Sequence, residues 1–275
     1  MRTSRSGNSL HGALICLALC LSACSTLPRN ALPGELVEQA AIPDMPVIRA
    51  YGGELSPYMM ADLGASFGQE SPDDFPVGAD GKIHYAHLAL SGGGQNGAFG
   101  AGLLYGWSKN GTRPVFKIVT GVSSGAMMAP FVFLGPEYDD ELRAFYTNTS
   151  SKNIFSRLSI LPQLLGGESL LDSGPLQAMI AQVVDADFLN NVAKAHKSGR
   201  RLYIGTVDLD AQRLVVWNMG LIASSGRPQA LGLFRQILLA SSSIPVAFPP
   251  VPFKVEADGR KYDELHVDGA IKATV

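Results

Sequence analysis

A serine flanked by glycines has the clearest catalytic context in this 275-residue chain. The segment Gly121-Val-Ser-Ser-Gly125 has the form G-x-S-x-G, which places a serine on a strained strand-to-helix turn with its hydroxyl exposed. A run rich in β-forming residues precedes it, and a helical stretch follows. The spacing of Gly121 and Gly125 puts Ser123 at the centre of the turn, with Ser124 as the alternative. The pattern predicts acyl transfer with Ser123 as the nucleophile.

A glycine-rich loop lies upstream of the serine, at Gly92-Gly-Gly-Gln-Asn-Gly97. Glycines let backbone N–H groups turn toward an anionic oxygen, so the loop is predicted to hold the oxyanion of an acyl-transfer intermediate. The predicted oxyanion residues are Gly92, Gly93, Gly94 and Gly97. The same letters match the dinucleotide fingerprint G-x-G-x-x-G, but the acidic residue expected about 20 positions beyond it is missing from residues 111–120. A plain strand-to-helix turn is the remaining alternative.

A carboxylate for the same reaction is offered by Asp268, in the segment Asp268-Gly-Ala270. Asp268 follows a predicted short strand, and from a strand end its carboxylate can reach a loop of the neighbouring strand. An ordinary turn, in which the carboxylate bonds the backbone ahead of a glycine, explains the same residues equally well.

Histidine is the usual base in serine catalysis, and four lie outside the N-terminal apolar segment: His84, His87, His196 and His266. None follows Asp268, as the α/β-hydrolase order of serine, acid and histidine requires. His196 lies at the end of a predicted helix, where a stabilising cation is the simplest explanation. Each of the four is therefore expected to be structural or solvated.

In this order, the three segments resemble the motifs of the patatin-like phospholipase family. That family combines an oxyanion loop G-G-G-x-K/R-G, a nucleophile turn G-x-S-x-G and an acid motif D-G-G/A, and it uses a Ser–Asp dyad without histidine. The resemblance extends from about His84 to Ala270 and includes the segment ASSSIPVAFPP at 240–250. It implies that Ser123 is the nucleophile, Asp268 the base and the glycine loop the oxyanion site.

One position departs from the family pattern. Asn96 stands where the family usually carries Lys or Arg. An amide still donates hydrogen bonds, but the positive charge that would contact a headgroup or an oxyanion is absent.

Alternating strands and helices predict an α/β domain, and the resemblance implies a three-layer α/β/α fold with a mostly parallel central sheet. The predicted strands are 83–90, 115–120, 201–207, 213–217 and 264–267. The predicted helices are 98–109, 139–147, 187–197 and 231–242, with a short or bent helix after Ser123 that contains Pro130. Residues 148–171 are irregular and apolar, which fits either a lid or surface packing, and 245–252 is predicted as a loop.

The N-terminus is typical of a bacterial secretory signal that ends in a lipobox. Arginines precede an apolar run from Ala13 to Leu21, which is too short to span a bilayer. The segment Leu21-Ser-Ala-Cys24 resembles the lipobox, whose cysteine becomes the lipid-modified N-terminus. An ordinary cleaved signal that contains a cysteine is the alternative. With Cys24 lipidated, the mature chain keeps no free cysteine, because Cys16 and Cys20 are removed.

These features divide the chain into a signal peptide (1–23), a lipid anchor with a proline-rich tether (24–50), an irregular lead-in (51–82) and an acyl-hydrolase domain (83–275). The domain stops seven residues after Asp268 in an apolar run without a terminator, which predicts that it is incomplete. Ser25 follows Cys24, and the resemblance of this segment to sorted lipoproteins implies the outer membrane, with the domain facing the periplasm.

Composition argues against other function classes. Charged residues make up 17% of the chain, the formal net charge is −2 and no Lys/Arg cluster occurs, so nucleic-acid binding has little electrostatic basis. No cluster of metal ligands is visible, so neither a metal nor an organic cofactor is predicted. The sequence predicts a membrane-anchored lipoprotein that hydrolyses lipid acyl esters. A catalytically silent lipid- or partner-binding protein and a nucleotide-binding protein are the alternatives.

Overall fold

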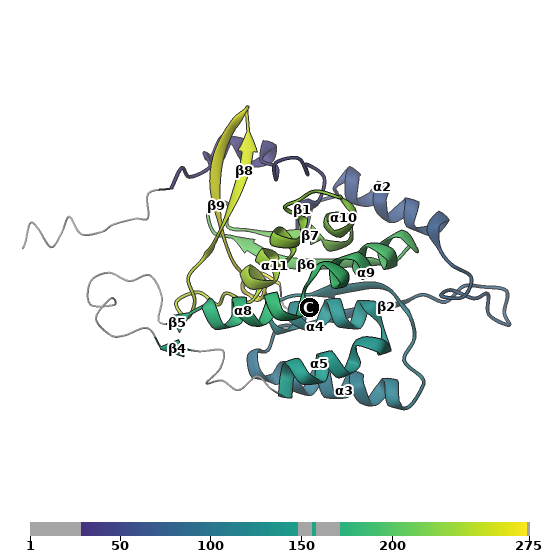
Figure 1. Ribbon diagram of the computed structural model, residues 1–275. Coiled ribbons are helices and arrows are strands. Elements are labelled where there is room, and N and C mark those ends of the chain that lie inside the picture. Colours follow the sequence, from purple (N-terminus) through teal and green to yellow (C-terminus); the bar gives the residue numbers. More distant parts are fainter. Residues whose placement is uncertain (1–28, 148–155, 158–170, 274–275) are drawn as a thin grey trace, which may run out of the picture.

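The computed structural model describes residues 29–147, 156–157 and 171–273 (Figure 1). The predicted signal peptide, Cys24 and nearly all of the apolar segment 148–171 lie outside these residues. Within them, no helix combines the length and the apolar character needed to cross a membrane.

The fold is built on a seven-stranded sheet in which β6 has three neighbours. The strands follow the order β1-β7-β6-β3-β2, and β9 pairs with both β6 and β8. They are β1 (Arg49–Tyr51), β2 (Ala86–Leu90), β3 (Phe116–Gly121), β6 (Arg201–Asp208), β7 (Arg213–Asn218), β8 (Val251–Ala257) and β9 (Arg260–Asp268). Two short strands, β4 (Ser156–Arg157) and β5 (Leu171–Asp172), form a separate antiparallel pair.

The sheet is mixed, so the prediction of a mostly parallel sheet is wrong. Only β2–β3 and β3–β6 are parallel, whereas β1–β7, β6–β7, β6–β9 and β8–β9 are antiparallel. The lengths of the connections explain the difference. A parallel pair needs a crossover of about a dozen residues or more. β6 and β7 are joined only by Leu209–Gln212, and β8 and β9 only by Asp258–Gly259, so each pair forms a hairpin.

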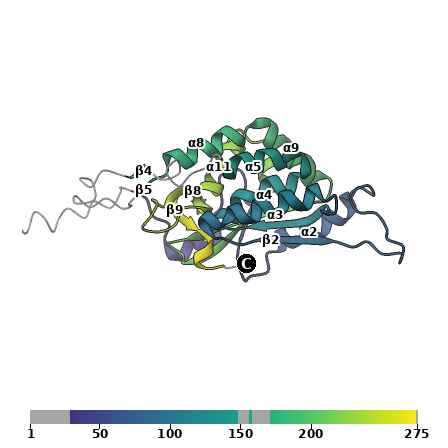
Figure 2. The ribbon, with the colours of Figure 1, turned by 90° about the horizontal axis from the view of Figure 1, so that it is seen from below.

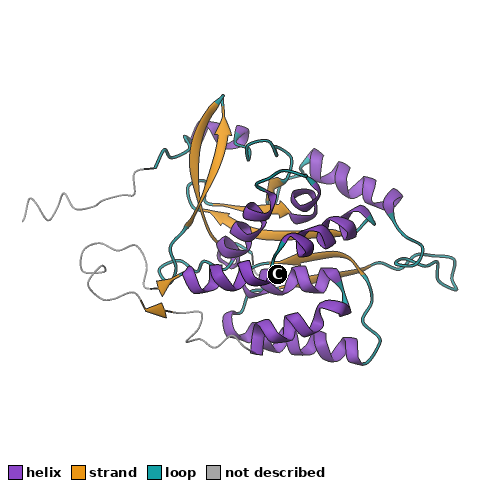
Figure 3. Cartoon of the chain, in the orientation of Figure 1, coloured by secondary structure: helices purple, strands orange, loops and turns teal. Residues whose placement is uncertain are grey.

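Helices pack around the sheet and complete the predicted α/β architecture (Figure 3). They are α2 (Pro57–Ser66), α3 (Gly97–Lys109), α4 (Ser124–Leu134), α5 (Asp139–Thr147), α8 (Gly174–Val183), α9 (Ala186–Lys197), α10 (Met219–Ser224) and α11 (Ala230–Ser241). Figure 2 shows α3, α4, α5, α8 and α9 together on one side of strand β2.

Helix α4 runs through the hydrophobic core. All residues from Gly125 to Leu134 are buried, as expected of a helix that is apolar on every side. It packs against β3, β6, α5 and α9. Pro130 lies inside α4, which nevertheless spans eleven residues. The core therefore holds the helix whose first residues follow the candidate nucleophile.

The segment predicted as an extended tether packs on the domain from residue 30 onward. Four of its apolar side chains lie in the main hydrophobic core: Leu32, Ile42, Met45 and Ile48. The N–H of Asp263, on β9, donates to the Asn30 carbonyl at 2.7 Å. The tether prediction is therefore wrong for residues 30–50, because apolar residues spaced between the prolines supply surface that the domain buries.

The lead-in 51–82, for which no element was predicted, contains α2 and the 3-10 helix η2 (Phe67–Gln69). α2 begins at a recognisable signal, since Pro57 is its first residue and Ser56 Oγ accepts the Met59 N–H at 3.4 Å. Beyond its end, the buried Lys117 of β3 donates to the Ser66 carbonyl at 3.2 Å and pairs with Glu70. These contacts attach the lead-in to the sheet.

The sequence analysis missed β8 and predicted only the end of β9. Residues Val251–Ala257 alternate between buried and more exposed positions, the pattern of a strand with one face on the core. Asp258 and Gly259 have φ values of 48° and 68°, as a two-residue type I′ turn requires. The resulting β8–β9 hairpin is the long yellow ribbon in Figure 1, and β9 carries the candidate acid at its last residue.

Candidate active site

Two strands end facing each other on one edge of β6. β3 pairs with the first half of β6, where Gly121 lies opposite Ile204, and β9 pairs with the second half, where Asp268 lies opposite Thr206. β7 occupies the other edge of β6. Because β3 is parallel to β6 and β9 is antiparallel to it, their carboxyl ends meet with only Gly205 between them. The serine turn after β3 and the aspartate at the end of β9 are thereby brought together.

Ser123 lies on the turn between β3 and α4. Its backbone angles are φ 54° and ψ −129°, a strained conformation for a residue other than glycine. The Ser123 hydroxyl donates a hydrogen bond to Asp268 Oδ2 at 2.6 Å. Ser123 is 6% exposed and Asp268 3% exposed, so the contact is shielded from water. The structure thus pairs the candidate nucleophile with the candidate acid across a separation of 145 residues.

Gly121 and Gly125 allow this turn to pack closely. A Cβ on Gly125 would lie 2.1 Å from the carbonyl oxygen of Leu90, at the end of β2, and one on Gly121 would lie 2.6 Å from the Gly125 carbonyl oxygen. Both contacts involve backbone atoms, so no side chain could move away to relieve them. The Val122 N–H also donates to the Leu90 carbonyl at 3.2 Å. The two glycines therefore let the turn sit directly on β2.

Serines at the end of α11 hold the pair from the other side. The Ser241 hydroxyl accepts the Ser123 N–H at 3.0 Å and donates to the Gly205 carbonyl at 2.7 Å. The Asp268 N–H donates to the Ser243 carbonyl at 2.9 Å. Sequence reasoning noted only that the segment 240–250 resembles a family loop. Its positioning role becomes visible only in three dimensions.

The Asp268 carboxylate is held by one hydrogen bond on each oxygen. Oδ2 accepts the Ser123 hydroxyl, and Oδ1 accepts the Ala270 N–H at 2.8 Å. Burial raises the pKa of Asp268 above its ordinary value, and the two hydrogen bonds oppose the shift only in part. A carboxylate with a raised pKa accepts a proton more readily than a solvated one, which suits a general base.

The glycine loop lies directly beside the Ser–Asp pair. A Cβ on Gly92 would lie 2.9 Å from the Ser123 Cβ and 3.0 Å from the Ala270 Cβ. Gly92 therefore lets the backbone pass between the nucleophile turn and the acid turn. Gly93 follows with φ 176° and ψ 11°.

The second half of the loop leads into α3. Gly94 has φ +54° and begins the 3-10 helix η3 (Gly94–Asn96), in which Asn96 is exposed. Gly97 is buried as the first residue of α3, and a Cβ there would lie 2.9 Å from the Ser124 Cβ. The loop is thus wrapped around the start of α4, with its backbone close to the nucleophile turn.

Ser124 is the first residue of α4 and faces the glycine loop. Its carbonyl accepts the Tyr146 hydroxyl at 2.8 Å, whereas its Oγ is buried with no hydrogen-bond partner among the described residues. A Cβ on Gly93 would lie 3.9 Å from this Oγ. The first N–H groups of a helix have no partner within the helix, so the start of α4 offers a further donor beside Ser123. Sequence reasoning considered Ser124 only as an alternative nucleophile.

No histidine bonds either side chain of the Ser–Asp pair in the described part of the chain. His84 and His87 are exposed. Burial, followed by the charge of Arg201, lowers the pKa of His196 to about 4, so His196 is neutral and not the helix-end cation that the sequence predicted. His266 is fully buried two residues before Asp268, where it contacts other groups.

A family model for patatin-like phospholipases matches residues 88–275 of this chain. The match covers more than half of the sequence and contains the glycine loop, the nucleophile turn and the acid motif. The chain therefore belongs to the patatin-like phospholipase family, as the three motifs predicted. No curated protein sequence matches it.

Solved structures that are similar to the chain include VipD and ExoU. VipD from Legionella pneumophila is 14% identical with a TM-score of 0.45, and the alignment covers 74% of this chain and 50% of VipD. ExoU, solved in complex with SpcU from the type III secretion system of Pseudomonas aeruginosa, is 18% identical with a TM-score of 0.29, and the alignment covers 60% of this chain and 39% of ExoU. The aligned part of this chain thus corresponds to half of VipD or less than half of ExoU.

Proposed function

We propose that this protein hydrolyses acyl esters of lipids, with Ser123 as the nucleophile and Asp268 as its base. The hydrogen bond of 2.6 Å from the Ser123 hydroxyl to Asp268 Oδ2 is the observation that carries the proposal. Membership in the patatin-like phospholipase family supports a lipid substrate. The absence of histidine partners supports a dyad over a triad in the described structure.

The proposed reaction has two halves. Asp268 Oδ2 takes the hydroxyl proton as the Ser123 oxygen attacks the acyl carbon, and the carbonyl oxygen becomes an oxyanion. N–H groups of the glycine loop and of the α4 start stabilise that charge. When the ester C–O bond breaks, the leaving alkoxide takes the proton from Asp268, and an acyl-serine remains. In the second half, water attacks the acyl carbon and gives a proton to Asp268. When the bond from the acyl carbon to Ser123 Oγ breaks, Asp268 returns that proton to the Ser123 oxygen, and the fatty acid is released.

Exposed apolar side chains on the segments that border the pair also support a lipid substrate. Phe99 and Leu103 lie one turn apart on α3, just after the glycine loop, and are 78% and 61% exposed. Val246 lies three residues after Ser243, whose carbonyl accepts the Asp268 N–H, and Ile271 lies three residues after Asp268. Their side chains are 72% and 51% exposed. Such side chains would favour contact with acyl chains over contact with water.

Vesicle hydrolysis tests the proposal. The full chain is incubated with phosphatidylcholine vesicles, and the released fatty acid is measured. We expect release by the natural protein and by Ser108→Ala, a control on α3 outside the site, and none by Ser123→Ala. If the folded natural protein released no acid from phospholipids, lysophospholipids, glycerides or a soluble aryl ester, the silent binding protein would be the better interpretation.

The raised pKa of Asp268 predicts an acid limb in the pH profile. Asp268 acts as a base only when ionised, so kcat/KM should fall as the pH drops through the raised pKa, above the ordinary aspartate value of 3.8. Measuring kcat/KM on a soluble ester between pH 3 and pH 8 gives the midpoint. Activity that persisted unchanged below the ordinary aspartate value would contradict the role of a buried Asp268.

Membrane attachment through Cys24 is the second part of the proposal, motivated by the lipobox-like sequence. Several acyl chains on one cysteine hold a protein firmly at a membrane, whereas one chain binds only marginally. We expect Cys24→Ala to leave the protein unprocessed or soluble, while the natural protein fractionates with the outer membrane. Mass spectrometry of the mature N-terminus provides the check, and an unmodified N-terminus at another residue would exclude lipidation at Cys24.

A further inference from the structure

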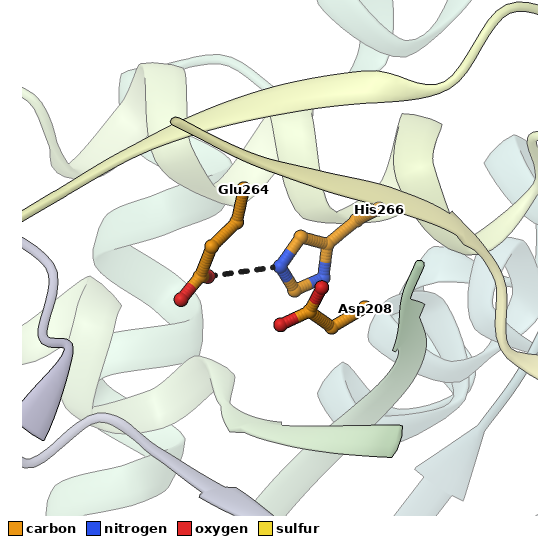
Figure 4. A group of neighbouring side chains, drawn as sticks. All are labelled: Asp208, Glu264 and His266. Carbon is orange, nitrogen blue, oxygen red and sulfur yellow. Dashed lines mark hydrogen bonds and ion pairs between the residues drawn. The ribbon is translucent and has the colours of Figure 1, made fainter. Parts of the chain in front are cut away.

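A second cluster of polar side chains is buried next to the acid strand end. Asp208 of β6 is the register partner of His266 on β9, and Glu264 lies two residues before His266, so all three project from one face of the sheet. Each is 0% exposed, and each offers an atom within 4.8 Å of the others. Figure 4 shows both carboxylates directed toward the His266 ring.

One oxygen of this cluster lacks a partner. Asp208 Oδ1 accepts the N–H groups of Asp210 and Ala211 at 2.9 and 3.2 Å. Asp208 Oδ2 is buried without any hydrogen-bond partner among the described residues. An unpaired carboxylate oxygen in a protein interior is strongly unfavourable, so a cation bound to this oxygen would stabilise the fold.

Further residues make hydrogen bonds to the other polar atoms of His266 and Glu264. His266 Nδ1 lies 2.8 Å from Thr206 Oγ1, which also accepts the Trp217 Nε1–H at 2.8 Å. Arg49 donates to the two oxygens of Glu264 at 2.5 and 2.9 Å. His266 Nε2 lies 3.2 Å from Glu264 Oε2, the contact drawn as a dashed line in Figure 4. Metal centres are commonly built in this way, with hydrogen bonds that orient each ligand.

We propose that Asp208, Glu264 and His266 bind one divalent transition-metal ion, with Zn²⁺ as the best match to two carboxylates and an imidazole. Zinc binds such ligands at about 2.0–2.2 Å, so the three ligand atoms, which lie within 4.8 Å of one another, would have to converge on the ion. The ion joins β6 to β9 two residues before Asp268, and its role is structural. The site is separate from the proposed ester chemistry.

Metal analysis of the purified full chain tests the site. The protein is dialysed against a chelator, and Zn²⁺ or Co²⁺ alone is then added while binding, the melting temperature and the visible absorption of Co²⁺ are recorded. We expect about one ion per chain, as a single closed site requires, and a higher melting temperature with the ion than without it. The Co²⁺ spectrum should be that of nitrogen and oxygen ligands.

Variants locate the ion. Asp208→Asn and His266→Gln should each weaken binding by more than about 100-fold, and Thr206→Val, which removes only the outer hydrogen bond, by about 10–100-fold. His84→Gln is the matched control, because His84 pairs with Asp80 at 2.9 Å in an exposed position. If a variant does not fold, the natural protein alone decides. Failure of the folded natural protein to bind either ion would overturn the proposal.

Discussion

Replacing Ser123 by Ala or Asp268 by Asn is expected to lower ester turnover by about 10⁴-fold or more, the scale seen when a nucleophile or its partner is removed from serine hydrolases. Ser123→Ala removes the attacking oxygen. Asp268→Asn keeps the shape of the side chain that accepts the Ser123 hydroxyl at 2.6 Å, but an amide cannot take the proton. Initial rates on a soluble ester and on lipid vesicles measure the loss, with circular dichroism to confirm folding.

The histidines provide the controls for this experiment. His84→Gln, His87→Gln and His196→Gln should keep most of the turnover. His266→Gln is the most informative of the four, because its ring contacts Thr206 and lies two residues from Asp268. A folded His266→Gln variant should lose the metal ion but still turn over ester. If one folded histidine variant lost activity as completely as Ser123→Ala, a triad would replace the dyad.

Gly94→Val is expected to reduce kcat by about 10²-fold or more, the usual cost of losing one oxyanion donor. Gly94 has φ +54°, which a β-branched residue adopts only with strain, so the loop must change its path and turn its N–H groups away. No atom lies within 4 Å of the added Cβ, so the Cβ itself meets no neighbour.

Gly102→Val on α3 is the matched control for the loop. Gly102 likewise has no atom within 4 Å of an added Cβ, but its φ is not positive. It should therefore keep nearly full turnover. Equal rates for folded Gly94→Val and Gly102→Val would show that the glycine loop does not form the oxyanion site.

The residues around the Ser–Asp pair were predictable because each stands next to a local signal. Ser123 lies between glycines at the end of an apolar strand, and Asp268 precedes a glycine at the end of another. Both signals describe a turn at a strand end, and strand ends are where loops of a sheet meet. What the sequence did not contain was the pairing of β3 and β9 along the same edge of β6, which brings the two turns together.

The errors in the predicted fold have two physical sources. The β8–β9 hairpin had a visible signal, the Asp258–Gly259 pair between alternating runs, which the proline-rich segment before it obscured. The packing of residues 30–50 had only a weak signal in the sequence, because apolar residues at irregular spacing show no period. These omissions made the sheet look more parallel than it is.

The buried cluster could not be predicted from spacing. Glu264 and His266 are separated by one residue and suggest a shared strand face, but Asp208 is far away in sequence. Only the antiparallel register of β6 and β9 places the unpaired Asp208 oxygen beside Glu264 and His266. Sequence analysis accordingly predicted no metal ligands.

The most direct test of the central claim is the covalent trapping of the nucleophile. The folded protein is treated with a fluorophosphonate, which reacts with activated serines, and the modified residue is identified by peptide mass spectrometry. The account predicts one adduct on Ser123, and a strongly reduced rate of labelling in Asp268→Asn. An adduct on Ser124 or another serine, or labelling of Ser123 that does not depend on Asp268, would contradict it.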